Sequence, residues 1–223
     1  MQIVEEYKKL LNEIDIWFKK SISIYPDQIK CNKGCSECCR GLFDITLLDA
    51  FFIKTGFKTL PVKTRDDLIN QANKIVKKTE KIWPDFAPPY LLNYKPAEEW
   101  DMIMPDDDET PCIFLDKHGN CLIYNYRPMT CRLHGLPMVD ISGEVMHDEW
   151  CTNNFIDSSP LEAEKIRAPF REIIKKEVEL GRLFSKERVG KVFYELDTLI
   201  PTAILIDFDN LILKDIPLVE EMP

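Results

Sequence analysis

The residues of this sequence best suited to metal chemistry are its eight cysteines. Four of them occur together in the segment CNKGCSECC, and the other four follow at wider intervals. The set comprises Cys31, Cys35, Cys38, Cys39, Cys112, Cys121, Cys131 and Cys151. A C-x3-C-x2-C run brings three thiolates into one turn of loop, where the curled backbone can direct N–H groups at sulfur. The spacing therefore predicts a metal or iron–sulfur site, with all eight cysteines as candidate ligands.

Cys38 and Cys39 are adjacent, and neighbouring side chains in extended backbone point to opposite sides. Two interpretations follow. Either Cys39 serves a second ion, since two four-thiolate sites would use all eight cysteines, or it is a buried apolar thiol beside a single site. Cys151 stands alone in the sequence, so an ordinary core position would also explain it.

Four thiolates suit both zinc and an iron–sulfur cluster such as [4Fe-4S], so the predicted cofactor is zinc or iron. Both kinds of centre carry net negative charge, which nearby cations and N–H donors stabilise. Arg40 and Arg132 directly follow cysteines and are the candidates for this role.

Histidines are the other candidate ligands. His134 follows Cys131 at a C-x2-H spacing, and His147 precedes Cys151 at an H-x3-C spacing, both of which a zinc site can use. An ordinary surface histidine explains each of them equally well, and His118 falls in a predicted turn.

Composition and charge restrict the class of protein. The chain has 223 residues, 45% of them hydrophobic, which is enough for a buried core. Its net charge of -9 argues against sequence-independent nucleic-acid binding, which depends on cationic side chains. Charges recur along the first 20 residues, so we expect neither a signal peptide nor a membrane helix, and no membrane partner. A cytoplasmic protein is expected, whose reduced thiols bind metal rather than form disulfides; no protein partner is indicated.

Three helices are predicted ahead of residue 90. Apolar residues at three- and four-residue steps indicate amphipathic helices over residues 3–19 and 65–82. The Thr46-x-x-Asp49 pattern is typical of a capping box that opens a helix through about Lys54. The segment of the first four cysteines shows no apolar periodicity, so we expect it to form an irregular loop between the first helix and the helix that begins after Thr46.

Later segments predict hairpins and further helices. Residues 112–124 alternate around a Lys-His-Gly-Asn turn, and residues 136–147 around Ser142-Gly143, so each is expected as a short β-hairpin. Two amphipathic helices are expected over 161–200, broken near Gly181, with Pro160 in a first turn. The acidic run 106–109 fits a solvated loop better than a cation site, and residues 203–213 are a terminal strand or a docked segment.

The predicted fold is α+β, predominantly helical, with a cysteine-rich core of loops and short β-hairpins. We expect a single domain over residues 1–223. Its metal-binding core spans 31–151, with the N-terminal helix 3–19 and a C-terminal helical region 161–200 packed around it.

Two segments, CSECCRGLFDITLLDA and PCIFLDKHGNCLIYNYRPMTCR, resemble the YkgJ-type CxxCxxCC cysteine-cluster family, a zinc- or iron-chelating domain. The resemblance covers roughly residues 31–151 and includes the order Pro111-Cys112, Gly119-x-Cys121 and Arg127-Pro128. It implies metal binding through Cys31, Cys35, Cys38, Cys39, Cys112, Cys121 and Cys131. The first cysteine spacing is x3, where the family motif has x2.

The same C-x3-C-x2-C spacing is the signature by which radical S-adenosylmethionine enzymes hold a four-iron cluster, and flagellin lysine methylases also resemble this motif. A radical-type methyltransferase is therefore an alternative function. Against it, Ser36 replaces the usual aromatic residue, and no strand–helix alternation predicts the partial barrel of such enzymes. A third interpretation is a structural metal within a protein-interaction module, so the sequence leaves catalysis open.

Overall fold

The computed structural model of this protein describes residues 2–105 and 107–213. Contacts within the chain divide it into two compact units. Unit 1 consists of Met1–Cys38 and Met129–Leu180, and unit 2 consists of Cys39–Pro128 and Gly181–Pro223. One boundary between the units therefore falls between the adjacent cysteines of the first cluster. The single-domain organisation stays a prediction.

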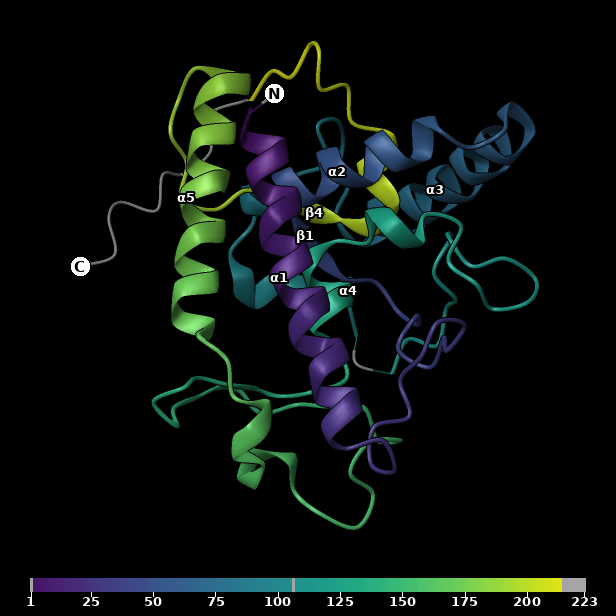
Figure 1. Cartoon of the computed structure of the whole chain (residues 1–223). Helices are drawn as coiled ribbons and strands as arrows, with labels where there is room; N and C mark the ends of the chain where they lie inside the picture. Colours follow the sequence, from purple (N-terminus) through teal and green to yellow (C-terminus); the bar gives the residue numbers. More distant parts are fainter. Residues whose placement is uncertain (1, 106, 214–223) are drawn as a thin grey trace. The chain divides into compact units, whose positions relative to one another are not determined.

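The long helix of unit 1 is α1 (Gln2–Ile24), which extends the helix predicted over residues 3–19 at both ends. Its buried residues recur at three- and four-residue steps: Val4, Tyr7, Leu10, Leu11, Ile14, Trp17 and Ser21. The short helix α4 (Met129–Leu133) packs against α1 (Figure 1). The indole N–H of Trp17 donates to the carbonyl of Ile166 at 2.6 Å, which joins α1 to the 3-10 turn η5 (Glu164–Ile166).

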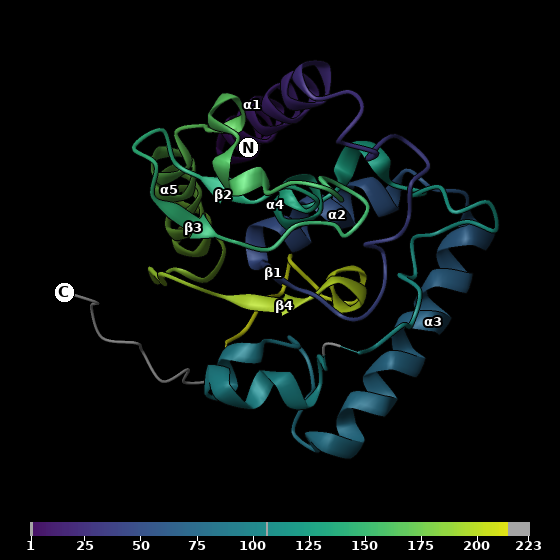
Figure 2. The same ribbon diagram turned by 90° about the horizontal axis from the view of Figure 1, so that it is seen from below.

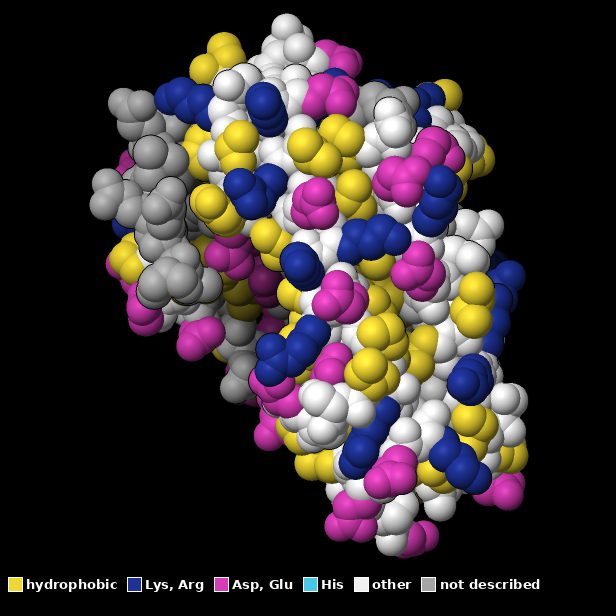
Figure 3. All heavy atoms as spheres, turned by 60° about the vertical axis from the view of Figure 1, so that its left-hand side comes forward, with side chains coloured by type: hydrophobic (Ala, Val, Ile, Leu, Met, Phe, Trp, Pro, Cys, Tyr) yellow, Lys and Arg dark blue, Asp and Glu magenta, His cyan; other side chains and the backbone are white. Residues whose placement is uncertain are grey.

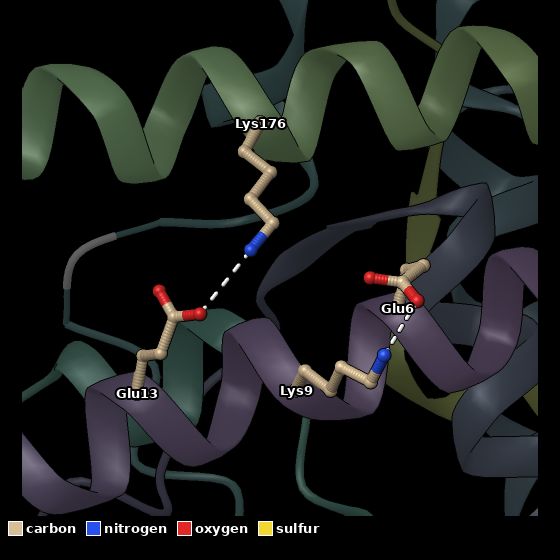
Figure 4. A network of polar contacts seen from close by, with 4 residues as sticks. All are labelled: Glu6, Lys9, Glu13 and Lys176. Carbon is tan, nitrogen blue, oxygen red and sulfur yellow. Dashed lines mark hydrogen bonds and ion pairs between the residues drawn. The ribbon is translucent and has the colours of Figure 1, made fainter.

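Helix α5 (Phe170–Val189) begins in unit 1, where it lies beside α1 (Figure 1). The ring of Phe170 meets that of Trp17 edge to face, with centroids 5.0 Å apart. Lys176 Nζ also lies 3.2 Å from Glu13 Oε1, close to the Lys9–Glu6 pair along α1 (Figure 4). Exposed pairs of this kind contribute at most about 1 kcal/mol, so the buried aromatic contact is the main stabilising interaction.

The helix break predicted near Gly181 is wrong, because α5 runs through this residue without interruption. A single glycine inside a helix costs only about 1 kcal/mol relative to alanine, which packing of the rest of the helix outweighs. Pro160 does not open an α-helix either. It begins the 3-10 turn η4 (Pro160–Glu162), ahead of α5.

The second predicted hairpin is confirmed in unit 1. Strands β2 (Met138–Val139) and β3 (Val145–His147) pair antiparallel. Asp140 closes the turn, since its N–H donates to the carbonyl of Glu144 at 2.8 Å, and its Oδ1 accepts the N–H of Arg171 at 3.1 Å. The carboxylate therefore ties the hairpin to the first turn of α5.

Unit 2 contains the other two predicted helices. Helix α2 (Leu47–Lys58) starts where the capping pattern indicated, because Thr46 Oγ1 accepts the N–H of Asp49 at 3.1 Å. It ends one turn later than predicted. Helix α3 (Val62–Ile82) likewise begins three residues earlier than the predicted range 65–82.

A two-stranded sheet and a docked segment complete the core of unit 2. Strand β1 (Asp44–Thr46) pairs antiparallel with β4 (Asp197–Leu199), and the two lie side by side in Figure 2. After the 3-10 helix η6 (Ile200–Ile204), the ammonium group of Lys54 donates to the carbonyls of Ile204 and Ile206. The apolar segment 203–213 is therefore docked on α2 and is not a strand.

The described chain is α+β and predominantly helical, as predicted: five α-helices accompany two small two-stranded sheets. Short 3-10 helices connect them in unit 2, namely η1 (Leu92–Tyr94), η2 (Ala97–Met102) and η3 (Tyr124–Tyr126). On the face shown in Figure 3, cationic and anionic side chains are interspersed. Among the described helices, none has the length and apolar character needed to cross a membrane.

Candidate metal centre

The eight cysteines all lie within the described residues, and none of them forms a disulfide. Cys35 is exposed, and the other seven are partly exposed. We call those in unit 1 the unit 1 thiols: Cys31, Cys35, Cys38, Cys131 and Cys151. We call those in unit 2 the unit 2 thiols: Cys39, Cys112 and Cys121.

The position of Cys31 is fixed by a buried amide side chain. Asn154 is 1% exposed, and its Nδ2 donates to Cys31 Sγ at 3.2 Å and to the carbonyl of Gly135 at 2.7 Å. Its Oδ1 accepts the N–H of Lys30 at 2.8 Å. One side chain thus joins three segments that are distant in sequence, and it directs an N–H group at a sulfur atom.

Cys151 lies beside Cys31. Its N–H donates to the carbonyl of Gly135 at 3.4 Å, and its thiol forms a hydrogen bond with that of Cys31. Burial raises the pKa of Cys31, the hydrogen bond from Asn154 lowers it, and the nearby thiols of Cys151 and Cys35 raise it. The cysteine that stands alone in the sequence is therefore a neighbour of the first cluster.

Gly135 leaves room for the sulfur of Cys31. Its φ angle is +112°, a conformation that side chains strongly disfavour. A Cβ atom at this position would lie 3.0 Å from Cys31 Sγ and 3.5 Å from Asn154 Nδ2. Glycine is therefore required both by the backbone and by the close approach of the thiol.

In unit 2, the backbone of the first cluster pairs with the segment that precedes Cys112. The N–H of Cys112 donates to the carbonyl of Cys39 at 2.9 Å, and the N–H of Gly41 donates to that of Thr110 at 2.9 Å. Arg40 and Pro111 form an antiparallel bridge between these two bonds. Cys39 and Cys112 are thus neighbours across a short ladder.

The thiols of Cys112 and Cys121 each accept a hydrogen bond from the backbone amide two residues further along the chain. Phe114 provides the hydrogen bond to the thiol of Cys112, and Ile123 provides that to Cys121. Burial, together with the nearby thiols of Cys121 and Cys39, raises the pKa of Cys112 to about 12. Burial also raises the pKa of Cys121, with a further contribution from Cys39. The unit 2 thiols therefore form one neighbourhood.

The hairpin predicted over residues 112–124 is present only in part. Leu115 and Cys121 form a single antiparallel bridge, and the N–H of Leu122 donates to the carbonyl of Phe114 at 2.8 Å. Two extended strands are absent from this described segment, because the residues after each cysteine turn so that an amide reaches sulfur. The tight turn itself forms as expected, with Asp116 Oδ1 accepting the N–H groups of His118 and Asn120.

The other residues singled out from the sequence have different surroundings. Arg132, which is buried, forms an ion pair with the partly exposed Asp15 of α1. Burial lowers the pKa of His134, and the neighbouring His147 lowers it further. Roles for these residues beside a metal stay predictions. In the acidic run, Asp108 Oδ1 accepts the N–H of Thr110, while residue 106 lies outside the described residues.

The donor set fits zinc or iron in its chemistry, since thiols that receive N–H hydrogen bonds are typical ligands of both metals. Among the side chains that the structure describes, no three His, Cys, Asp or Glu residues are arranged to hold an ion as they stand. The thiols would therefore have to close around the metal. Sequence reasoning missed Asn154 and Gly135, because no spacing connects them to Cys31.

The fold and the two groups of thiols define a cysteine-cluster domain built from loops among helices. The model of the CxxCxxCC family, described as a "putative zinc- or iron-chelating domain", matches residues 30–152, more than half of the chain. The chain therefore belongs to this family, which confirms the resemblance seen in its cysteine motifs. Neither a curated protein nor a solved structure matches the chain.

Proposed function

We propose that this protein binds zinc or iron through its cysteine thiolates. Membership of a family described as zinc- or iron-chelating supports metal binding in general. The observation that carries the proposal is the gathering of cysteines from distant segments, with an N–H group directed at sulfur in each group. Asn154 provides it at Cys31, and backbone amides provide it at Cys112 and Cys121.

The proposed ligands are drawn from the eight thiolates, namely Cys31, Cys35, Cys38, Cys39, Cys112, Cys121, Cys131 and Cys151. Bound zinc would supply a structural four-coordinate centre, whereas an iron–sulfur cluster would supply electron transfer. N–H donors stabilise both, because they compensate the negative charge of the thiolates. Since the described thiols must move together to close a site, we expect metal binding to order the cysteine loops.

Metal analysis of the full chain tests the proposal. After anaerobic purification, elemental analysis should find zinc or iron bound in a fixed ratio to protein. Brown colour and visible absorbance with iron and sulfide would identify a cluster, and a colourless protein with zinc would identify a zinc site. A protein that neither carries nor takes up zinc or iron would contradict the proposal.

Substitutions in the first cluster give a second test. Cys35→Ala and Cys38→Ala should each lose bound metal together with thermal stability, because the loss of one thiolate opens the coordination shell. Ser36→Ala lies between them in the same loop and is the matched control, for which metal content should not change. Full metal content in both cysteine variants would show that these thiols are not ligands.

A further inference from the structure

The adjacent residues Cys38 and Cys39 belong to different units. Glu37 and Cys38 lie in a turn, and the extended pairing of the backbone begins only after it, at Arg40. The backbone of Cys39 is paired with that of Cys112 at 2.9 Å, which fixes it within unit 2. The cluster is therefore divided at this peptide bond.

The contacts of Cys31, Cys151 and Cys121 follow the same division. Cys31 forms its thiol hydrogen bond with Cys151, and Gly135 lies against both of them, all within unit 1. Cys121 is joined to the segment after Cys112 by a backbone bridge and a hydrogen bond, all within unit 2.

Each group also has its own N–H donors to sulfur. In unit 1 the donor is the side chain of Asn154, and in unit 2 the donors are the backbone amides of Phe114 and Ile123. Hydrogen bonds to thiolate are a regular feature of individual metal centres, where they offset the charge of the ligands. Two sets of donors fit two separate centres better than one shared centre.

We propose that the chain holds two metal ions, one in each unit, and this inference rests on the proposed metal-binding function. The first ion would be held by Cys31, Cys35 and Cys151, with a fourth thiolate from Cys38 or Cys131. The second would be held by Cys39, Cys112 and Cys121. The ligand class is a thiophilic divalent cation, for which zinc is the probe.

The test is the number of zinc ions bound to the full chain, measured by native mass spectrometry after loading and removal of loosely bound metal. The wild-type chain should retain two ions. Cys35→Ser should retain one, because it opens only the first centre, and Cys112→Ser should also retain one. The combined variant should retain none.

Control variants separate ligand loss from misfolding. Cys35 is exposed, so its substitution leaves the core intact, and Ser36→Ala keeps every thiol in the same loop. If Cys112→Ser fails to fold, Cys121→Ser gives the same test of the second centre. Far-UV circular dichroism of each variant should match that of the wild-type chain.

The outcomes distinguish this inference from the function on which it rests. A single zinc in the wild-type chain that is lost in both Cys35→Ser and Cys112→Ser would overturn the two-centre inference and keep metal binding. Two ions that are lost together in either variant would also overturn it, because the thiols would then form one coupled centre. A chain that binds no zinc or iron would overturn both.

Discussion

In unit 1 a side chain donates to the sulfur of Cys31, whereas in unit 2 backbone amides donate to the sulfur atoms of Cys112 and Cys121. Asn154 reaches Cys31 from a distant segment, and Gly135 makes room for the sulfur. Cys112 and Cys121 instead use amides two residues away in their own segments. A local backbone arrangement survives most substitutions, but a side-chain clamp is lost with one residue. The comparison predicts that unit 1 is the more sensitive group to changes outside the cysteines.

The largest expected effect is a pH dependence contributed by Asp197 of unit 2. Burial, together with the charge of Glu195, raises the pKa of Asp197 in β4 to about 8. The unfolded carboxyl has a pKa near 3.8, so between pH 3.8 and about 8 the unfolded state binds fewer protons than the folded state. The free energy of unfolding should therefore fall as pH rises through this window, by several kcal/mol at about 1.4 kcal/mol per pKa unit.

Asp197→Asn should remove this dependence of stability on pH, because the new amide cannot ionise. It can still form a hydrogen bond with Asn93. Urea unfolding of both proteins between pH 4 and 8 measures the difference, with thiols kept reduced and metal removed. An identical pH slope in the two proteins would show that Asp197 ionises normally.

The next largest effect tests the side-chain clamp of unit 1. Asn154→Ala should lower the free energy of unfolding of the metal-free chain by about 3 kcal/mol, because it leaves the N–H of Lys30 and the carbonyl of Gly135 without a buried partner. Asn153→Ala, at the exposed neighbouring position, is the matched control and should change stability by less than about 0.5 kcal/mol. Equal effects in urea unfolding would mean that the clamp contributes nothing.

The helices and Asn154 show which features of the structure could be predicted from the sequence and which could not. Apolar periodicity and the Thr46 cap are local signals, so α1, α2 and α3 were predictable in type and near-correct in extent. Asn154 has no local signal. Its role arises only from the folding of three distant segments onto one another, as does the position of Cys151 beside Cys31.

The errors have the same origin. Gly181 carries a helix-breaking tendency that packing of α5 overrides. The hairpin over 112–124 fails as a pair of strands because its amides turn toward sulfur, and the alternating sequence pattern gives no sign of this. The grouping of eight cysteines into two neighbourhoods follows from chain topology, and the sequence indicated it only through the adjacent Cys38 and Cys39.

A third effect concerns the support of the unit 2 thiols. Tyr126 belongs to η3, the turn that follows Cys121, and packs on Gly56 of α2. A Cβ at Gly56 would lie 2.5 Å from the Tyr126 ring. Gly56→Ala should therefore destabilise the protein by about 2 kcal/mol through overpacking. Gly181→Ala is the matched control, because nothing lies within 4 Å of its added Cβ, and it should stabilise α5 by about 1 kcal/mol. Thermal unfolding that shifts both variants in the same direction would contradict this packing.

The smallest of these effects is the difference between two glycines with positive φ. Gly135→Ala should cost about 2 kcal/mol, from backbone strain and from contact with Cys31 Sγ at 3.0 Å. Gly190→Ala, with φ +72° and open space around it, should cost only the strain, about 1 kcal/mol. If urea unfolding gives the same loss of stability for both variants, contact with the Cys31 thiol adds no cost at Gly135.

The division of the thiols is tested most directly by mapping which cysteines zinc protects. The zinc-loaded Cys35→Ser chain is treated with iodoacetamide and digested, and the alkylated peptides are identified by mass spectrometry. We expect Cys39, Cys112 and Cys121 to stay protected, while Cys31 and Cys151 become reactive. Alkylation of all five cysteines to the same extent would contradict the account, because one shared centre would then have been lost as a whole.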